Sequence, residues 1–320
     1  MARKSLTTFV ITTVALLAIM VIGTRMLPDR VRKLPIADSS ETLKPNRYLS
    51  TDNATTLDQL IFHHRLEDVA GPIKQADVIF AGNSRSLFAF RAEACDSYFD
   101  GRNLKWYHAG FPSENNVFTQ HVLETYDATP QMVIVNADDF FTGNISTIAR
   151  RSVDISSFGA RTLYWESRMS YRMRHRLHQW LPHSPTMFFS PESMIVHRSL
   201  SNGSWHIGET RGRPTGVDQR SGHATPGDDH LKVAVQFQQF VNDRGGELVL
   251  TYVPKPTNDR ARAAAISRHL GCRFVAPRLD ELRTIDGSHL DNESAARFAA
   301  AFLRELDTTA VAMKAPPAHR

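Results

Sequence analysis

The stretch Ala76–Arg85, Ala-Asp-Val-Ile-Phe-Ala-Gly-Asn-Ser-Arg, decides the fold. Residues 78–81 form a short, apolar, partly β-branched run that ends at Gly82, which is typical of a buried central strand of an α/β sheet. Residues 86–94 then have the composition and spacing of a helix. Ser84 is therefore predicted to lie in a strand-to-helix turn at the carboxyl edge of a sheet, where open α/β sheets bind ligands. Serine is also a preferred helix N-cap, which is the structural alternative for this hydroxyl.

Apolar runs alternate with helical patterns along much of the chain. Strands are predicted at 78–81, 104–108, 132–135, 248–253 and 273–275, and helices at 57–66, 86–94, 114–126 (with Ser113 as its cap), 229–243, 261–270 and 292–306. This alternation predicts an α/β fold with a doubly wound, mainly parallel five-stranded sheet in a flavodoxin-like three-layer arrangement. Residues 143–227 break the pattern and are expected to be a helical insertion that shapes a substrate groove or touches a membrane.

The clearest change in composition comes near the N-terminus. Residues 7–24 carry no charged side chain, and a helix of that length would span about 27 Å, enough to cross a bilayer. We therefore expect a short tail over 1–6, a transmembrane anchor over 7–24 and a proline-rich stalk over 25–70. A cleavable signal peptide is the alternative, because Arg3 and Lys4 form a basic start, but no Ala-x-Ala-like site follows.

Charge and cysteine content exclude several classes of protein. The net charge is +5, and residues 147–220 hold 11 arginines against 5 acids, which indicates a solvated face or a surface for an anionic membrane or polysaccharide. No nucleic-acid-binding motif accompanies these arginines, so a nucleic-acid partner is not expected. Cys95 and Cys272 are too few for a disulfide framework, and buried free thiols are favoured over a single bridge.

No metal or other cofactor is predicted. His175 and His178 have the i, i+3 spacing that zinc uses on a helix, but no third ligand completes a recognisable set. At the other end of the chain, residues 307–320 contain paired prolines and are predicted to be a disordered tail.

The segment Thr284-Ile-Asp-Gly-Ser-His-Leu290 carries a second group of reactive residues. Asp286 and His289 stand three residues apart in a turn after the last predicted strand, at the sheet edge where Ser84 is expected. A serine hydroxyl becomes a strong nucleophile when a histidine accepts its proton and a carboxylate orients that histidine. The structural alternative is an Asp-Gly turn that caps the last helix beside an exposed histidine.

With these blocks in this order, the chain resembles the SGNH (GDSL-like) hydrolase superfamily, particularly its envelope-anchored branch of alginate O-acetylation and teichoic acid D-alanylation proteins. Gly82-Asn83-Ser84-Arg85 stands where the family has Gly-Asp-Ser, Gly110 at the second block, and Asp286-Gly287-Ser288-His289 at the last block. The resemblance covers residues 74–306 and leaves the insertion unmatched, so the SGNH-like domain is placed at 71–306. It implies a catalytic Ser84, a His289 base and an orienting Asp286.

The resemblance also implies an oxyanion hole formed by the backbone N–H groups of Ser84 and Gly110. The third family block, Gly-x-Asn-Asp, aligns on residues 136–139 and puts Asp138 where an oxyanion-donating asparagine belongs. An ionised carboxylate only accepts hydrogen bonds. Either Asn136 supplies the third donor from a shifted position, or the site works with two donors.

Asp138 could instead pair with Arg85 or with the arginine-rich insertion. Arg85, Asp138 and Asn115 are the candidate substrate-binding residues.

The resulting hypothesis is a membrane-anchored serine acyltransferase or esterase that acts on O-acyl groups, mainly acetyl, of an envelope polysaccharide. By resemblance, a membrane-bound O-acyltransferase would be its partner. A single-pass placement in the inner membrane with the domain in the periplasm follows from this chemistry, although the basic residues after the anchor outnumber those before it and favour the opposite orientation. A lipase or thioesterase, and a catalytically silent scaffold subunit, are the alternatives.

Overall fold

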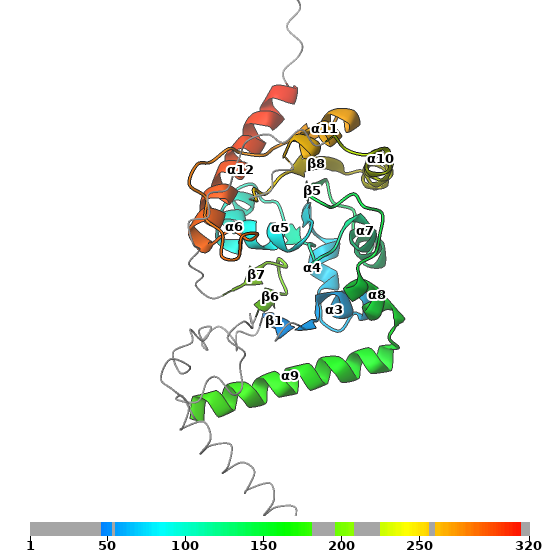
Figure 1. Ribbon diagram of the computed structural model, residues 1–320, viewed down its shortest axis with the longest axis vertical. Helices are drawn as coiled ribbons and strands as arrows, with labels where there is room; N and C mark the ends of the chain where they lie inside the picture. Colours follow the sequence, from blue (N-terminus) through cyan, green and yellow to red (C-terminus); the bar gives the residue numbers. More distant parts are fainter. Residues whose placement is uncertain (1–45, 53–54, 181–195, 208–224, 256–259, 315–320) are drawn as a thin grey trace, which may run out of the picture.

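The central element is a sheet of five parallel strands. A computed structural model describes residues 46–52, 55–180, 196–207, 225–255 and 260–314 (Figure 1). The strands follow the order β4-β3-β5-β8-β9. Their bounds are β3 (Val78–Ala81), β4 (Trp106–His108), β5 (Met132–Asn136), β8 (Glu247–Thr251) and β9 (Arg273–Phe274). This confirms the predicted five-stranded parallel sheet.

The helices cover both faces of the sheet, which makes the fold three-layered (Figure 1). On one face lie α5 (Ser84–Ala89), α6 (Ala92–Asp100) and α12 (Asn292–Lys314), and on the other α7 (Asn116–Thr125), α10 (Asp228–Asn242) and α11 (Arg260–Leu270). Alternating strand residues supply both cores, because successive side chains point to opposite faces. Phe80 packs with Phe298 under α12, whereas Ile79 packs with Phe118 of α7.

The strand order creates a switch point beside the first strand. The chain leaves β3 to form β4 on one side and then crosses back to form β5 on the other side. The helix after β3 (α5) and the helix after β4 (α7) lie on opposite faces of the sheet, and in such folds ligands bind at the carboxyl ends of the strands beside the switch point. Ser84 directly follows β3, and Asn136 ends β5.

A second, antiparallel sheet was not predicted. It has the order β2-β1-β6-β7 and is formed by β1 (Arg47–Asp52), β2 (Thr55–Thr56), β6 (Val196–Ser199) and β7 (Trp205–His206). The insertion expected to be helical thus contributes two strands besides α8 (Thr147–Asp154) and α9 (Ser157–Trp180). These strands are short and contain buried polar residues, so they lack the alternation that marks a strand in a sequence.

Residues 47–52 and 55–70, expected to belong to a stalk, are part of the folded body. They form β1, β2 and α3 (Asp58–His64), and α4 (Ala70–Lys74) follows. Leu49 and Phe62 are buried in the core cluster that includes Ile79 of the central sheet. The stretch therefore packs against the domain instead of leaving it.

A fully buried ion pair joins the second sheet to the central fold. Arg198 of β6 contacts Asp58 of α3 at 2.9 Å, and neither side chain is exposed. The other guanidinium nitrogens donate to the carbonyl oxygens of Gly203 and His108, and Trp205 Nε1 donates to Asp58 at 3.1 Å. Because every charged group has partners, the pair fixes β6 and β7 against the end of β4.

The predicted anchor over 7–24 and tail over 1–6 lie outside the described residues. Among the helices that the structure describes, none combines the length and the apolar character needed to span a bilayer. At the C-terminus, α12 continues to Lys314, so a helix occupies much of the stretch predicted to be a disordered tail.

Candidate active site

Ser84 occupies the first position of α5, at the carboxyl end of β3. The helix cap is Asn83, whose Oδ1 accepts a hydrogen bond from the N–H of Arg85 at 3.0 Å. Gly82 makes the preceding turn with a φ of +134°, which side-chain-bearing residues rarely adopt. Because Asn83 provides the cap, the structural alternative for the Ser84 hydroxyl does not apply.

The structure brings Ser84, His289 and Asp286 together. His289 Nε2 lies 2.8 Å from Ser84 Oγ, and His289 Nδ1 lies 2.6 Å from Asp286 Oδ2. Residues 205 positions apart in the chain thus form one continuous hydrogen-bonded chain. With its Nδ1 proton donated to the carboxylate, the imidazole presents an accepting Nε2 to the hydroxyl, which is the tautomer that proton abstraction requires.

Local structure holds Asp286 and His289 in this arrangement. Asp286 Oδ1 accepts hydrogen bonds from the backbone N–H groups of Ser288 and His289, both at 2.9 Å, and Gly287 adopts a φ of +81° in the turn. Burial alone would raise the pKa of Asp286, but the hydrogen bonds from the His289 ring and from the turn lower it. The carboxylate therefore stays ionised and orients the imidazole.

Phe88, which was not predicted as a site residue, supports the imidazole from α5. Its ring centroid lies 4.4 Å from that of His289 and 5.8 Å from that of Trp205 in β7. Phe88 and Trp205 form a small apolar cluster that Ile285 also contacts. The second sheet thus supports the histidine through one phenylalanine, with Trp205 of the insertion as the outer contact.

A cluster of charged side chains begins at Arg85, the residue after Ser84. Asp138 is buried and pairs with Arg85 and with Lys255, whose Nζ lies 2.7 Å from Asp138 Oδ1. Arg262 pairs with Asp139 at 2.7 Å. Burial would raise the pKa of Asp139, but the Arg262 hydrogen bond and the positive charges of Lys255 and Arg85 lower it. Three cations and two carboxylates leave this cluster net positive.

The cluster bears out one alternative from the sequence, because Asp138 pairs with Arg85 instead of facing Ser84 as a donor. Lys255 and Arg262 were missed. Lys255 follows β8 at the same sheet edge as Ser84, so its position after a predicted strand was the signal that could have identified it.

Gly110 lies against the end of β3, but its N–H group already has a partner. A Cβ at this position would lie 2.9 Å from the Gly82 carbonyl oxygen and 2.6 Å from the His108 ring, so only glycine fits. The Gly110 N–H donates to His108 Nδ1 at 3.0 Å. In this structure the group predicted to stabilise an oxyanion is thus used to hold the loop after β4.

Buried His108 makes the fold sensitive to acid. Burial, and secondarily the charge of Arg198, lowers the pKa of His108 from 6.5 to about 3. Between these values the unfolded chain binds a proton that the folded chain excludes, so stability is complete above the unfolded pKa and falls as the pH drops.

As the pH drops from 6.5 to 5, we expect the exclusion of this proton from His108 to lower the free energy of unfolding by about 2 kcal/mol. A His108→Asn variant keeps an acceptor for the Gly110 N–H but cannot titrate. Chemical denaturation of both proteins from pH 7 to pH 4 gives the free energy of unfolding as a function of pH, and the slopes of the two curves are compared. Equal slopes would show that His108 does not exclude the proton.

Asn136 is oriented by the segment that follows β8. Its Oδ1 accepts a hydrogen bond from the Val253 N–H at 3.0 Å, which leaves the buried Nδ2 donor with no partner among the described residues. Asn136 packs closely against Gly82, two residues before Ser84: a Cβ added to Gly82 would lie 3.1 Å from the Asn136 Cβ. A buried amide donor without a partner is costly, which makes this donor a candidate for a role toward a bound substrate.

Two other predicted positions have structural roles. Asn115 is 8% exposed and caps α7 by accepting a hydrogen bond from the Val117 N–H at 3.1 Å. Ser113, predicted to be that cap, instead adopts a φ of +60° in the preceding turn.

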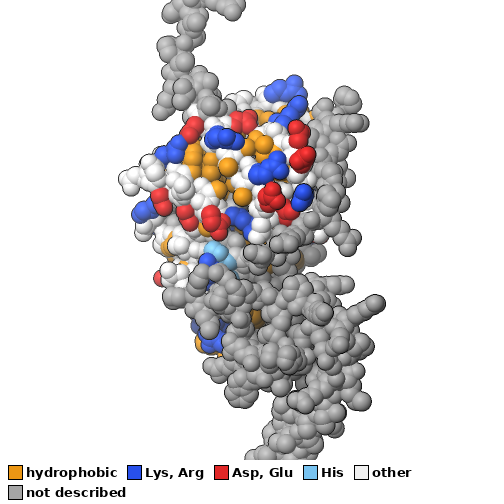
Figure 2. All heavy atoms as spheres, turned by 90° about the vertical axis from the view of Figure 1, so that its left-hand side faces the viewer, with side chains coloured by type: hydrophobic (Ala, Val, Ile, Leu, Met, Phe, Trp, Pro, Cys, Tyr) orange, Lys and Arg blue, Asp and Glu red, His pale blue; other side chains and the backbone are white. Residues whose placement is uncertain are grey.

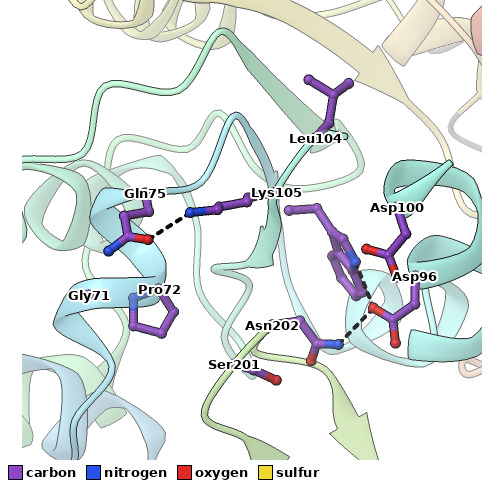
Figure 3. A pocket seen from close by; sticks show the side chains of 10 residues that line it. Gly71, Pro72, Gln75, Asp96, Asp100, Leu104, Lys105, Ser201 and Asn202 are labelled. Atoms are coloured by element: carbon purple, nitrogen blue, oxygen red, sulfur yellow. Dashed lines mark hydrogen bonds between the residues drawn. The ribbon is translucent and has the colours of Figure 1, made fainter. Parts of the chain in front are cut away.

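A cavity of about 480 Å³ lies at the other end of β4, away from the three hydrogen-bonded residues. Asp96 accepts hydrogen bonds there from Trp106 and Asn202, and Lys105 donates to Gln75 (Figure 3). These lining groups satisfy one another. Within the described ranges, no group of three or more His, Cys, Asp or Glu side chains is placed to hold a metal ion.

Comparisons with known proteins add little to this geometry. No protein-family model matches the chain, and no curated protein matches it. Among solved structures, it is similar to the crystal structure of a proposed acylhydrolase from Bacteroides fragilis NCTC 9343, with 10% identity and a TM-score of 0.35. The match covers 75% of this chain and 93% of that chain. A TM-score this low carries no argument about activity.

Proposed function

We propose that the protein is a membrane-anchored serine acyltransferase or esterase that acts on O-acyl groups, mainly acetyl, of an envelope polysaccharide. The observation that carries the proposal is the hydrogen-bonded chain Ser84–His289–Asp286 at the switch point of the sheet. Ser84 is the nucleophile, His289 the general base and then acid, and Asp286 the orienting carboxylate.

The proposed reaction proceeds through an acyl-enzyme. Ser84 Oγ forms a bond to the acyl carbon while its proton passes to His289 Nε2. The ester C–O bond then breaks, and the leaving alcohol takes the proton from His289. Water or a sugar hydroxyl next gives its proton to His289 and attacks the acyl carbon; the bond between that carbon and Ser84 Oγ then breaks, and Ser84 Oγ takes the proton back from His289. Water gives hydrolysis, and a sugar hydroxyl gives transfer to the polymer.

Asn136 is proposed to stabilise the oxyanion together with the backbone N–H of Ser84. The unpartnered Nδ2 donor of Asn136 supports this role, while Gly110 would have to release His108 before it could contribute.

An Asn136→Asp variant keeps the acceptor for Val253 but removes the Nδ2 donor. We expect it to lower kcat by about 10²-fold to 10³-fold, the usual loss for one oxyanion donor. Thermal unfolding, run alongside the kinetics, shows whether the variant is folded at the assay temperature. A folded Asn136→Asp protein with unchanged kcat would remove Asn136 from the site.

An ester panel tests the proposed substrate class. Purified full-length protein in detergent is assayed on acetyl, butyryl and long-chain acyl esters and on an O-acetylated polysaccharide, with Ser84→Ala as the control. We expect the acetyl ester to be preferred and acetate release or transfer to depend on Ser84. A preference for long acyl chains would instead indicate a lipase or thioesterase.

A silent scaffold subunit remains the second candidate because of two specific observations. Asp138, at the position of a family oxyanion donor, is neutralised by Arg85 and Lys255, and the Gly110 N–H is bound to His108. This candidate predicts that a Ser84→Ala strain shows wild-type polysaccharide acylation. The main proposal also includes a placement in the inner membrane and a membrane-bound O-acyltransferase as partner.

A further inference from the structure

Helix α9 exposes an apolar stripe along one side. Phe158, Trp165, Met169 and Met173 are 82%, 58%, 56% and 60% exposed. Their spacing of 7, 4 and 4 residues places them on one face of the helix. Single exposed apolar residues are common, but four aligned large side chains on one helix are typical of a binding surface.

The opposite face of α9 is fixed to the body of the protein. Ala160, Tyr164 and Tyr171 are buried, and the Tyr164 hydroxyl donates to Glu67. Arg168 adds an ion pair to Glu67 at 2.8 Å. The exposed stripe therefore points away from the body of the protein, on a helix whose other face is fixed by these contacts.

The exposed charges on α8 and α9 are mainly positive. On α9 itself Arg161 and Arg172 are exposed against Glu166, and on the preceding α8 Arg150 and Arg151 are exposed against Asp154. By contrast, the face that carries α6 and α12 shows side chains of both signs interspersed around hydrophobic ones (Figure 2). Aromatic and methionine side chains bordered by arginines match the composition of helices that lie in the interface of anionic bilayers.

The position of α9 fits a membrane as its partner. The helix packs on β1, the first described strand, and runs along the end of the described part of the protein that lies away from β8 and α11 (Figure 1). Residues 25–46 join the uncharged segment 7–24 to β1 and span at most roughly 80 Å when extended. An anchored chain would thus hold this end of the domain within reach of the bilayer.

We infer that α9 docks in the plane of an anionic membrane surface, with Phe158, Trp165, Met169 and Met173 inserted among the lipids and the neighbouring arginines at the phosphate level. The inference deepens the proposed function, since it rests on the proposed placement at a membrane. Docking fixes the orientation of the domain, whereas an anchor alone leaves it free to tumble on its tether.

The test places a fluorescent label at Met169→Cys in the full-length protein, in a Cys272→Ser background that keeps the buried Cys95. Val235→Cys is the matched control, because Val235 is an apolar residue 45% exposed on α10. Both proteins are reconstituted in vesicles of phosphatidylcholine and phosphatidylglycerol that contain brominated lipid. We expect quenching at position 169 to be at least about 3-fold stronger than at position 235.

Two further arms make the outcome decisive. Adding Phe158→Ser and Trp165→Ser should abolish the excess quenching, and pure phosphatidylcholine should weaken it. Equal quenching at both positions would overturn the inference. So would a label at position 169 that, in detergent, becomes shielded from solvent only as the protein concentration rises, because this would identify another copy of the protein as the occupant of the stripe. Flotation with the vesicles reports the anchor, and ester hydrolysis reports the active site, so each can fail separately.

Discussion

Replacing Ser84 with alanine is expected to lower ester hydrolysis by at least about 10³-fold, because the other site residues cannot form the acyl-enzyme. The loss should appear in kcat, with little change in KM, since the hydroxyl is a small part of the surface that binds substrate. Progress curves with an activated acetyl ester measure both constants.

The matched control for this variant is Ser86→Ala. Ser86 lies two residues further along α5, is buried, and donates to the Asn83 carbonyl at 2.7 Å without contacting His289. It should retain activity within about 10-fold if the Ser84 effect is chemical. An equal loss in both variants would mean that damage to the turn, and not loss of a nucleophile, explains the result.

Breaking the buried ion pair is expected to have the largest effect on stability. Asp58→Asn or Arg198→Met should each lower the free energy of unfolding by about 3–5 kcal/mol, because the remaining charge stays buried without its partner. Chemical denaturation, followed by tryptophan fluorescence, measures the change. The double variant should lose less than the sum of the two single variants, since it leaves no unpaired charge.

The exposed pair Lys74–Asp127 is the control for this prediction. Its nitrogen and oxygen are 2.8 Å apart, but the side chains are 61% and 79% exposed. Solvent screens such a pair, so Asp127→Asn should leave the denaturation midpoint unchanged. If Asp58→Asn is equally harmless, Arg198 does not hold the second sheet in place.

The central sheet was predictable because its strands are uninterrupted apolar runs. Val78–Ala81 is buried on both faces, and such runs are recognisable without knowledge of their partners. The placement of Ser84, Asp286 and His289 at one edge of the sheet was also predictable, since parallel strands bring their carboxyl ends to the same edge. Their hydrogen-bonded arrangement needed the structure.

The second sheet was not predictable because distant partners stabilise it. Arg198 is buried in β6 only because Asp58, 140 residues away, neutralises it. From sequence it counted as one of many arginines on a solvated surface. The helix caps were mispredicted for a related reason. Ser and Asn are both good N-caps, and only the backbone conformation shows that Asn83 and Asn115 are the residues used.

The most direct test of the account is intact-mass analysis of the full-length protein after exposure to a fluorophosphonate and, separately, to an activated acetyl ester. The account predicts one covalent adduct on the parent protein with each reagent and none on Ser84→Ala. Absence of an adduct on a folded parent protein would contradict an activated Ser84 and favour the silent scaffold.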